Sequence, residues 1–243
     1  GFWPDGIYTA PTDEALRWDI ETMKKLGFNC VRKHIKVEPS RWYYWCDKLG
    51  LMVWQDMPSA NSYLDGKDRE KPVAVDKPQY KAELINMVRS NWNHPSIIMW
   101  VVFNEEQGQH DTDSLAAEVK GLDPTRLLNP ASGTTVWGKV HDTKSGDVMD
   151  VHIYPGPSSP TPTAERVAVL GEFGGLGFPV EGHKWSKNVW GYKNSADPKT
   201  WISEYEKLLA KTWELKDQPG LSGAIYTQLT DVESEGNGLV TYD

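Results

Sequence analysis

The stretch Ile97-Ile98-Met99-Trp100-Val101-Val102-Phe103-Asn104-Glu105 is an apolar run that ends in an amide and a carboxylate. So continuous a run predicts a strand buried on both faces, as strands are in parallel sheets. A second apolar run, from Val167 to Gly171, ends in Glu172 and is followed by Phe173-Gly174-Gly175. A carboxylate is costly to remove from water, so two of them at the ends of buried strands indicate a functional site.

Helical and extended segments alternate outward from these two runs. Apolar stripes at helical spacing, with capping residues such as Thr12 and Asp197, predict helices near residues 12–26, 38–49, 78–94, 114–121 and 197–212. Short apolar runs predict strands at residues 28–32, 51–55, 97–105, 126–129, 148–153, 167–171 and 223–227. This alternation is typical of a parallel sheet covered by helices.

The polar residues favour a closed barrel over an open sheet. No G-x-G-x-x-G phosphate loop follows a predicted strand, which disfavours the doubly wound fold. Polar side chains gather instead after the carboxyl ends of the strands, at Arg32, His34, Asp56, Asn104, Glu105, His152, Tyr154, Glu172 and Asp231. That end is the catalytic face of an α/β barrel. We therefore predict the α/β class and a (β/α)8 TIM barrel.

Such a barrel has eight strands, whereas seven can be found here. The chain opens Gly1-Phe2-Trp3-Pro4, which resembles a loop leaving a strand, so we expect the first strand to lie upstream of residue 1. The barrel would then have an open seam between its second and eighth strands.

Composition excludes two classes of partner. The net charge of −8 offers no basic face for a phosphate backbone, so we expect no nucleic acid partner. No stretch approaches the roughly 18 consecutive apolar residues of a membrane-spanning helix. Neither observation bears on the oligomeric state.

A pair of carboxyl groups is the machinery of glycoside hydrolysis. One protonates the leaving oxygen, and the other either attacks the anomeric carbon or activates a water. Asn104, directly before Glu105, suits a hydrogen bond to the sugar 2-hydroxyl. Gly171 and the pair Gly174-Gly175 allow the backbone to approach the site closely around Glu172.

The motifs resemble, in order, the barrel domain of glycoside hydrolase family 2, which includes β-galactosidases, β-glucuronidases and β-mannosidases. They are Asn29-Cys30-Val31-Arg32-Lys33-His34, Phe103-Asn104-Glu105, Asp150-Val151-His152-Ile153-Tyr154 and Gly171-Glu172-Phe173-Gly174-Gly175. The likeness runs over almost the whole chain.

That resemblance implies a retaining exo-β-glycosidase acting on a carbohydrate substrate, with no cofactor and no metal. By the same resemblance, Glu105 is the acid/base, Glu172 is the nucleophile, and Arg32, His34, Asn104, His152 and Tyr154 hold the substrate or the catalytic pair. It also implies that residues 1–243 are the catalytic domain of a larger protein with upstream β-sandwich domains, and it suggests a periplasmic or secreted location.

Two alternatives remain beside this reading. His34, His152 and Asp231 could serve a metal-dependent hydrolase, although they form no H-x-H or H-E-x-x-H pattern. The barrel could also bind carbohydrate without catalysis. Glu106 competes with Glu105 for the cleft, since strand alternation is unreliable at a strand end.

The basic cluster Arg32-Lys33-His34-Lys36 could favour an acidic sugar, but alternation is expected to split it. The last strand lacks the Trp that many relatives place there, so a ring from Trp137, Trp185 or Trp190 is expected to line the sugar pocket. The sugar and its linkage do not follow from the sequence.

Overall fold

The structure is a computed structural model that describes residues 3, 6, 9–59, 75–134 and 142–241. Its main wall is built from seven parallel strands in two sheets, ordered β1-β2-β3-β4 and β5-β6-β9. The strands are β1 (Cys30–Lys33), β2 (Met52–Asp56), β3 (Ile97–Val101), β4 (Leu127–Asn129), β5 (Val148–Ile153), β6 (Val167–Gly174) and β9 (Leu221–Thr227). These seven strands correspond to the seven predicted from the sequence.

The described residues form five helices: α1 (Asp13–Lys25), α2 (Ser40–Leu49), α3 (Lys77–Asn91), α4 (Thr112–Leu122) and α5 (Pro198–Asp217). Local chemistry sets several of their ends. The Thr12 hydroxyl accepts from the Ala15 amide at 3.1 Å, and the Asp197 carboxylate accepts from the Thr200 amide at 3.0 Å. Gly50 ends α2 in the left-handed conformation, which an L side chain rarely adopts.

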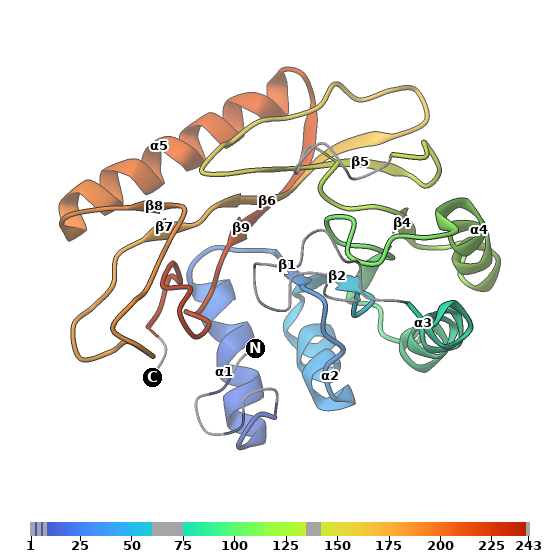
Figure 1. Ribbon diagram of the computed structural model, residues 1–243, viewed down its shortest axis with the longest axis horizontal. Helices are drawn as coiled ribbons and strands as arrows, with labels where there is room; N and C mark the ends of the chain where they lie inside the picture. Colours follow the sequence, from blue (N-terminus) through green and yellow to red (C-terminus); the bar gives the residue numbers. More distant parts are fainter. Residues whose placement is uncertain (1–2, 4–5, 7–8, 60–74, 135–141, 242–243) are drawn as a thin grey trace.

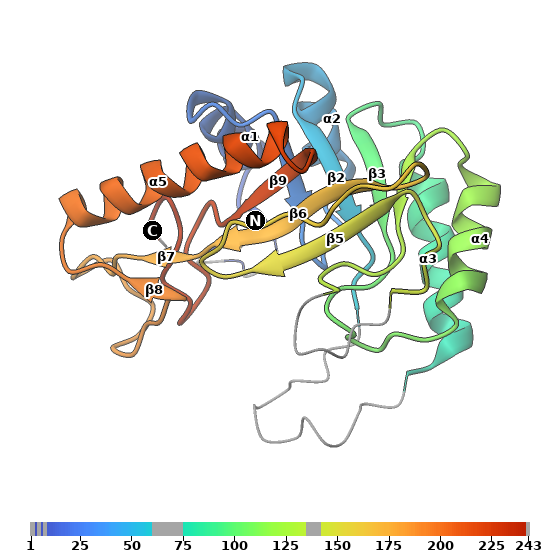
Figure 2. The ribbon, with the colours of Figure 1, turned by 90° about the horizontal axis from the view of Figure 1, so that it is seen from above.

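The arrangement is that of a TIM barrel with an open seam. Figure 1 shows α1 to α4 flanking the β1–β4 sheet and α5 lying along the β5–β6–β9 sheet, and Figure 2 shows the strands running alongside one another. Strands β9 and β1 are in contact, but no strand of the described residues pairs with both of them. A short pair outside the wall, β7 (Leu176–Gly177) and β8 (Lys193–Asn194), was not predicted.

The core has an inner and an outer part, as a barrel requires. Trp54, Met99, Val101, Val148 and Val169 form one buried cluster of strand residues. The helices cover the outside of the strands through two further clusters, one holding Leu16, Trp42, Leu84 and Val119, and the other holding Leu170, Phe173 and Tyr205. The central strands such as β3 are therefore buried on both faces, as their apolar sequence predicts, whereas most of β9 is only partly buried.

Strand alternation divides the basic cluster after β1. Arg32 points to the inside, where it binds Glu172, whereas Lys33 points to the outside and donates to Glu38 at 2.7 Å. Lys36 also pairs with Glu38, at 3.0 Å. The expected split of the cluster is confirmed. None of the described helices is long and apolar enough to cross a membrane.

Candidate active site

The centre of the site is the guanidinium of Arg32, which is buried at the carboxyl end of β1. It forms a two-pronged bond to Asp56 at the end of β2, with Nε to Oδ1 at 3.0 Å and Nη2 to Oδ2 at 2.8 Å. Nη2 also donates to Oδ1 of Asn104 at 2.7 Å, and Nη1 donates to Oε1 of Glu172 at 3.0 Å. One buried cation thus ties together the ends of three further strands.

Glu172 is held as an ionised carboxylate. Besides Arg32, it accepts a hydrogen bond from the hydroxyl of Tyr154, at 2.6 Å to Oε2, and the imidazole Nε2 of His34 lies 3.6 Å from Oε1. Burial alone would raise the pKa of Glu172, but His152, Arg32, His34 and the Tyr154 hydroxyl lower it to about 2. A carboxylate held in this state at neutral pH suits nucleophilic attack.

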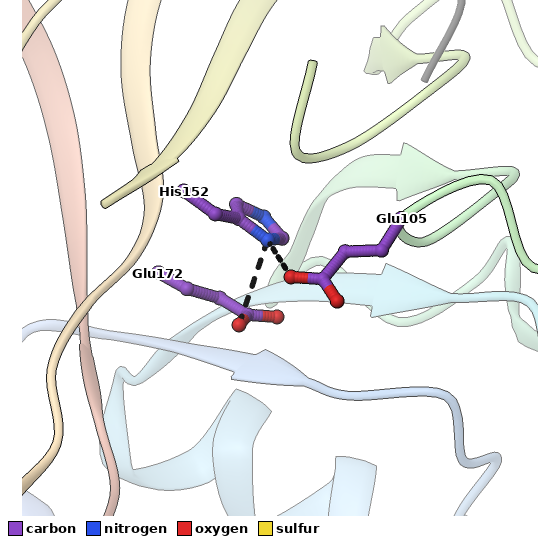
Figure 3. A group of neighbouring side chains, drawn as sticks. All are labelled: Glu105, His152 and Glu172. Carbon is purple, nitrogen blue, oxygen red and sulfur yellow. Dashed lines mark hydrogen bonds and ion pairs between the residues drawn. The ribbon is translucent and has the colours of Figure 1, made fainter. Parts of the chain in front are cut away.

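Glu105 approaches Glu172 through a shared histidine (Figure 3). Nδ1 of His152 lies 2.7 Å from Oε1 of Glu105 and 3.5 Å from Oε2 of Glu172. Nδ1 and one oxygen from each carboxylate all lie within 4.8 Å of one another. Carboxyl groups of retaining glycosidases stand about 5–5.5 Å apart, and those of inverting enzymes about 6.5–9.5 Å. The bound of 4.8 Å refers to the nearest oxygens and is compatible with the shorter of these separations.

The far side of His152 is fully enclosed by polar groups. The Ser132 hydroxyl donates to Asp150 Oδ2 at 2.7 Å and also lies 2.7 Å from Nε2 of His152. Nη1 of Arg32 lies 3.2 Å from the same Nε2. Burial lowers the pKa of His152, but Glu172, Glu105 and Asp150 outweigh it and raise that pKa above its ordinary value.

The backbone around Glu105 is specialised. Glu105 and Glu106 both have positive φ angles, 46° and 61°. Such angles are uncommon for residues other than glycine and tend to occur at functional sites. Gly133, with φ of 80°, lies beneath them, and a Cβ added there would stand 2.7 Å from His152 Nδ1 and 3.1 Å from Glu105 Cγ. Glycine is therefore required at this approach.

All seven predicted site residues lie at one end of the barrel. Glu105 is the glutamate whose carboxylate stands beside Glu172. Arg32, Asn104, His152 and Tyr154 bond to the two carboxylates or to each other, whereas the His34 side chain is 52% exposed and open to a ligand. Asn104 gives its carbonyl oxygen to Arg32, and no described residue accepts from its Nδ2.

Sequence reasoning did not assign roles to Asp56, Ser132 or Asp150, which hold Arg32 and His152. Asp56 had a signal, because it ends an apolar strand on the catalytic face. Asp150 had one also, since it lies two residues before His152 and shares its side of the strand. Ser132 follows the short strand β4 in a loop, where no local pattern marks it.

The aromatic ring that stacks beside the nucleophile comes from a tyrosine and not from one of the expected tryptophans. Tyr192, in the loop between β7 and β8, stacks on Tyr154 with centroids 3.5 Å apart and planes at 5°. Trp190 meets Tyr192 edge-on at 5.3 Å. Trp190 thus packs against Tyr192, which was not predicted from the sequence. Trp137 lies outside the described residues.

No group of possible metal ligands among the described residues contains all three residues of the metal alternative, His34, His152 and Asp231. Asp231 accepts from the Gly238 amide at 2.8 Å in the loop after β9, and the candidate metal cluster found among the described residues is Glu105, His152 and Glu172 instead. In that cluster Glu172 is already bound by the Arg32 guanidinium at 3.0 Å. A fixed cation at this distance opposes a second, divalent one, so the group is better suited to proton transfer than to metal binding.

Known proteins resemble this chain in sequence. A family profile described as "Glycosyl hydrolases family 2, TIM barrel domain" matches residues 9–155. A β-galactosidase of Enterobacter cloacae is 40% identical over 126 residues, which are 50% of this chain and 12% of that protein. A putative β-glucuronidase of Formosa agariphila is 30% identical over 132 residues, 53% of this chain and 12% of that protein. The chain therefore matches about an eighth of the length of these relatives.

Solved structures share the fold. A GH2 β-galacturonidase of Eisenbergiella tayi, bound to glycerol, superposes with a TM-score of 0.71 and 17% identity, covering 99% of this chain and 46% of that one. A β-glucuronidase of Bacteroides uniformis superposes with a TM-score of 0.64 and 20% identity, over 94% of this chain and 31% of that one. At these identities the likeness concerns the barrel alone.

Proposed function

This chain belongs to glycosyl hydrolase family 2 through its TIM barrel domain, and on that premise we propose that it carries the active site of a retaining exo-β-glycosidase, with Glu105 as acid/base and Glu172 as nucleophile. The observation that carries the proposal is the close approach of the two carboxylates, within 4.8 Å, around His152. So close an approach supports the short carboxyl separation of a retaining enzyme.

In the first step Glu172 attacks the anomeric carbon while Glu105 protonates the departing oxygen. Arg32 and Tyr154 each hold one oxygen of the Glu172 carboxylate in place, which lowers the entropic cost of orienting it for attack. The C–O bond to the leaving group breaks as the bond from Glu172 to carbon forms. Glu105, which lies 2.7 Å from Nδ1 of His152, supplies the proton that the leaving oxygen takes up.

In the second step a water attacks the glycosyl-enzyme. Glu105, now ionised, takes a proton from that water, the sugar leaves Glu172, and Glu105 is protonated again. Two displacements at carbon return the original anomeric configuration. Asn104 Nδ2 is placed to donate to the sugar 2-hydroxyl throughout, a contact that strengthens in the transition state.

We also propose that the chain is one domain of a larger multidomain protein, since its curated relatives are about eight times as long as the matched segment. Those relatives include both a neutral-sugar enzyme, the β-galactosidase, and an acidic-sugar enzyme, the putative β-glucuronidase. The relatives therefore leave the substrate open between neutral sugars and uronic acids.

The test is the stereochemistry of hydrolysis by the full-length protein. A panel of nitrophenyl β-glycosides identifies a substrate, and proton NMR in the first minutes identifies the anomer released. We expect the β-anomer, unchanged turnover after treatment with EDTA, and loss of turnover in Glu172→Gln. Release of the α-anomer, or hydrolysis that EDTA abolishes and a divalent metal restores, would overturn the proposal. A protein that binds sugar yet hydrolyses nothing in the panel would favour the binding-only alternative.

A further inference from the structure

Glu235, in the loop that follows β9, is a third carboxylate at the catalytic end of the barrel. The backbone of Trp190 forms hydrogen bonds to the residues directly before and after Glu235. The Trp190 amide donates to the Ser234 carbonyl at 2.8 Å, and the Gly236 amide donates to the Trp190 carbonyl at 2.8 Å. Glu235 is thereby fixed against the segment that carries Tyr192.

Two routes of contact lead from Glu235 to the nucleophile. Along the first, Trp190 packs on Tyr192, Tyr192 stacks on Tyr154, and Tyr154 donates to Glu172. The second route runs through the buried amide of Asn237. Its Nδ2 donates to Glu235 Oε1 at 3.0 Å, and it would stand 3.3 Å from a Cβ added to Gly175, three residues after Glu172.

The Glu235 carboxylate is oriented but not saturated. Asn237 is fully buried, and its Oδ1 accepts from Gln228 at 2.7 Å, which turns its Nδ2 toward Glu235. No described residue donates to Oε2 of Glu235, and the side chain is half-buried. Burial together with the charges of Glu172 and Glu105 raises the pKa of Glu235.

Among the described residues, the cations after β1 are already paired. Arg32 is engaged by Asp56 and Glu172, and Lys33 and Lys36 are turned outward to Glu38. A sugar carrying a carboxylate would add a further negative charge to Glu105, Glu172 and Glu235. Like charges brought together in a partly dry pocket repel strongly.

Building on the proposed glycosidase function, we infer that Glu235 is a specificity-determining residue, which accepts a hydrogen bond from a hydroxyl of a neutral sugar and excludes uronic acids. A carboxylate is a strong acceptor for a sugar hydroxyl. The same carboxylate, held in place by Asn237, has nowhere to move when a uronate approaches. The substrate class is therefore a neutral β-glycoside.

Equilibrium binding tests this inference without requiring turnover. The ligands are δ-lactams of neutral hexoses in the gluco and galacto configurations, each paired with the matching hexuronic acid lactam. Their affinities are measured by calorimetry on the full-length protein, on Glu235→Gln, and on Glu233→Gln, a matched control on the same loop whose side chain is exposed. Thermal unfolding of each variant checks that it folds.

We expect the wild-type protein to bind one neutral lactam at least about tenfold more tightly than its uronic partner. Glu235→Gln should weaken the neutral lactam and lower that ratio by at least about tenfold, because the charge is removed while the shape is kept. Glu233→Gln should leave the ratio unchanged. The inference is overturned if the wild-type protein prefers the uronic lactam, if it binds neither lactam, or if Glu235→Gln leaves the ratio as it was.

Hydrolysis measured on the same preparations separates this inference from the proposed function. Selective binding of neutral lactams without hydrolysis of any glycoside supports the role of Glu235 and contradicts the glycosidase mechanism. Efficient hydrolysis of glucuronides or galacturonides by the wild-type protein supports the mechanism and contradicts the role of Glu235.

Discussion

The imidazole Nδ1 of His152 bonds to Oε1 of Glu105 at 2.7 Å. His152 is also the register partner of Glu172 across β5 and β6, so its side chain emerges beside that of Glu172. The imidazole ring is completely buried. The two carboxylates are therefore linked through a group that solvent does not reach.

Replacement of the two neighbouring glutamates distinguishes their roles. Glu105→Gln removes the acid while keeping its shape, so we expect kcat for a β-glycoside with an alkyl leaving group to fall by about 10²–10⁴-fold. A dinitrophenyl glycoside, whose leaving group needs little protonation, should be much less affected in its first step. Glu106→Gln is the matched control and should change kcat by less than about threefold. A larger loss in Glu106→Gln than in Glu105→Gln would reverse the assignment.

The Tyr154 hydroxyl stabilises the ionised form of Glu172, so its removal should change how kcat/KM depends on pH. The pKa of Glu172 is lowered to about 2 from the ordinary value of 4.5, so its ionisation stabilises the fold above pH 4.5, and this stabilisation is lost as the pH falls toward 2. A hydrogen bond to a charged group contributes about 1.5–3 kcal/mol, equivalent to about one to two pH units.

Tyr154→Phe should therefore move the acidic limb of the kcat/KM profile to higher pH by about one unit or more. Tyr44→Phe, on the exposed face of α2, is the control and should leave the profile in place. An acidic limb that stays where it is in Tyr154→Phe would mean that Glu172 does not depend on this donor.

The buried pair of Arg32 and Asp56 should be important for stability as well as for the site. Asp56→Ala leaves part of the guanidinium without a partner, and breaking such a pair costs about 3–5 kcal/mol of unfolding free energy. Glu21→Ala, which breaks the exposed pair with Arg17, should cost less than about 0.5 kcal/mol. Urea denaturation of both variants measures the difference. Equal losses would contradict the central place of Arg32.

Gly133 and Gly27 separate the requirement for space from the requirement for a backbone conformation. Both have positive φ, 80° and 90°, so Ala at either position should cost about 1 kcal/mol of stability. A Cβ at Gly133 would contact His152 and Glu105, whereas a Cβ at Gly27 would meet nothing within 4 Å. Gly133→Ala should thus lower kcat by at least about tenfold and Gly27→Ala should not, because small misplacement of catalytic groups is costly. Similar kcat values in both variants would count against the close packing at Gly133.

The strands were predictable because both of their faces are buried. The apolar run that begins at Ile97 could form only a covered strand, and it became β3, Ile97–Val101. Helix ends were predictable where one side chain caps them, as at Thr12 and Asp197. The packing of side chains at helix ends was not predictable. Trp92 continues the apolar stripe of α3 in the sequence, yet it caps the end of the helix and is 59% exposed.

The site also has residues that could be predicted from the sequence and residues that could not. Glu105 and Glu172 could be predicted because a charge at the end of a dry strand is conspicuous. Tyr192 and Glu235 could not, because each lies in a loop whose path depends on long-range contacts. The stack of Tyr192 on Tyr154 joins residues on separate elements, and the bond of Asn237 to Glu235 has no sequence signature.

The central claim, that Glu172 attacks the sugar while Glu105 serves as acid/base, is tested most directly by trapping the covalent intermediate. The full-length protein is incubated with an activated 2-deoxy-2-fluoro β-glycoside of a sugar it hydrolyses, and intact mass and peptide mapping follow. We predict one added fluoroglycosyl group per chain, located on Glu172 and absent from Glu172→Gln. An adduct on Glu105 or Glu106, or turnover of the unfluorinated glycoside without any adduct, would contradict the account.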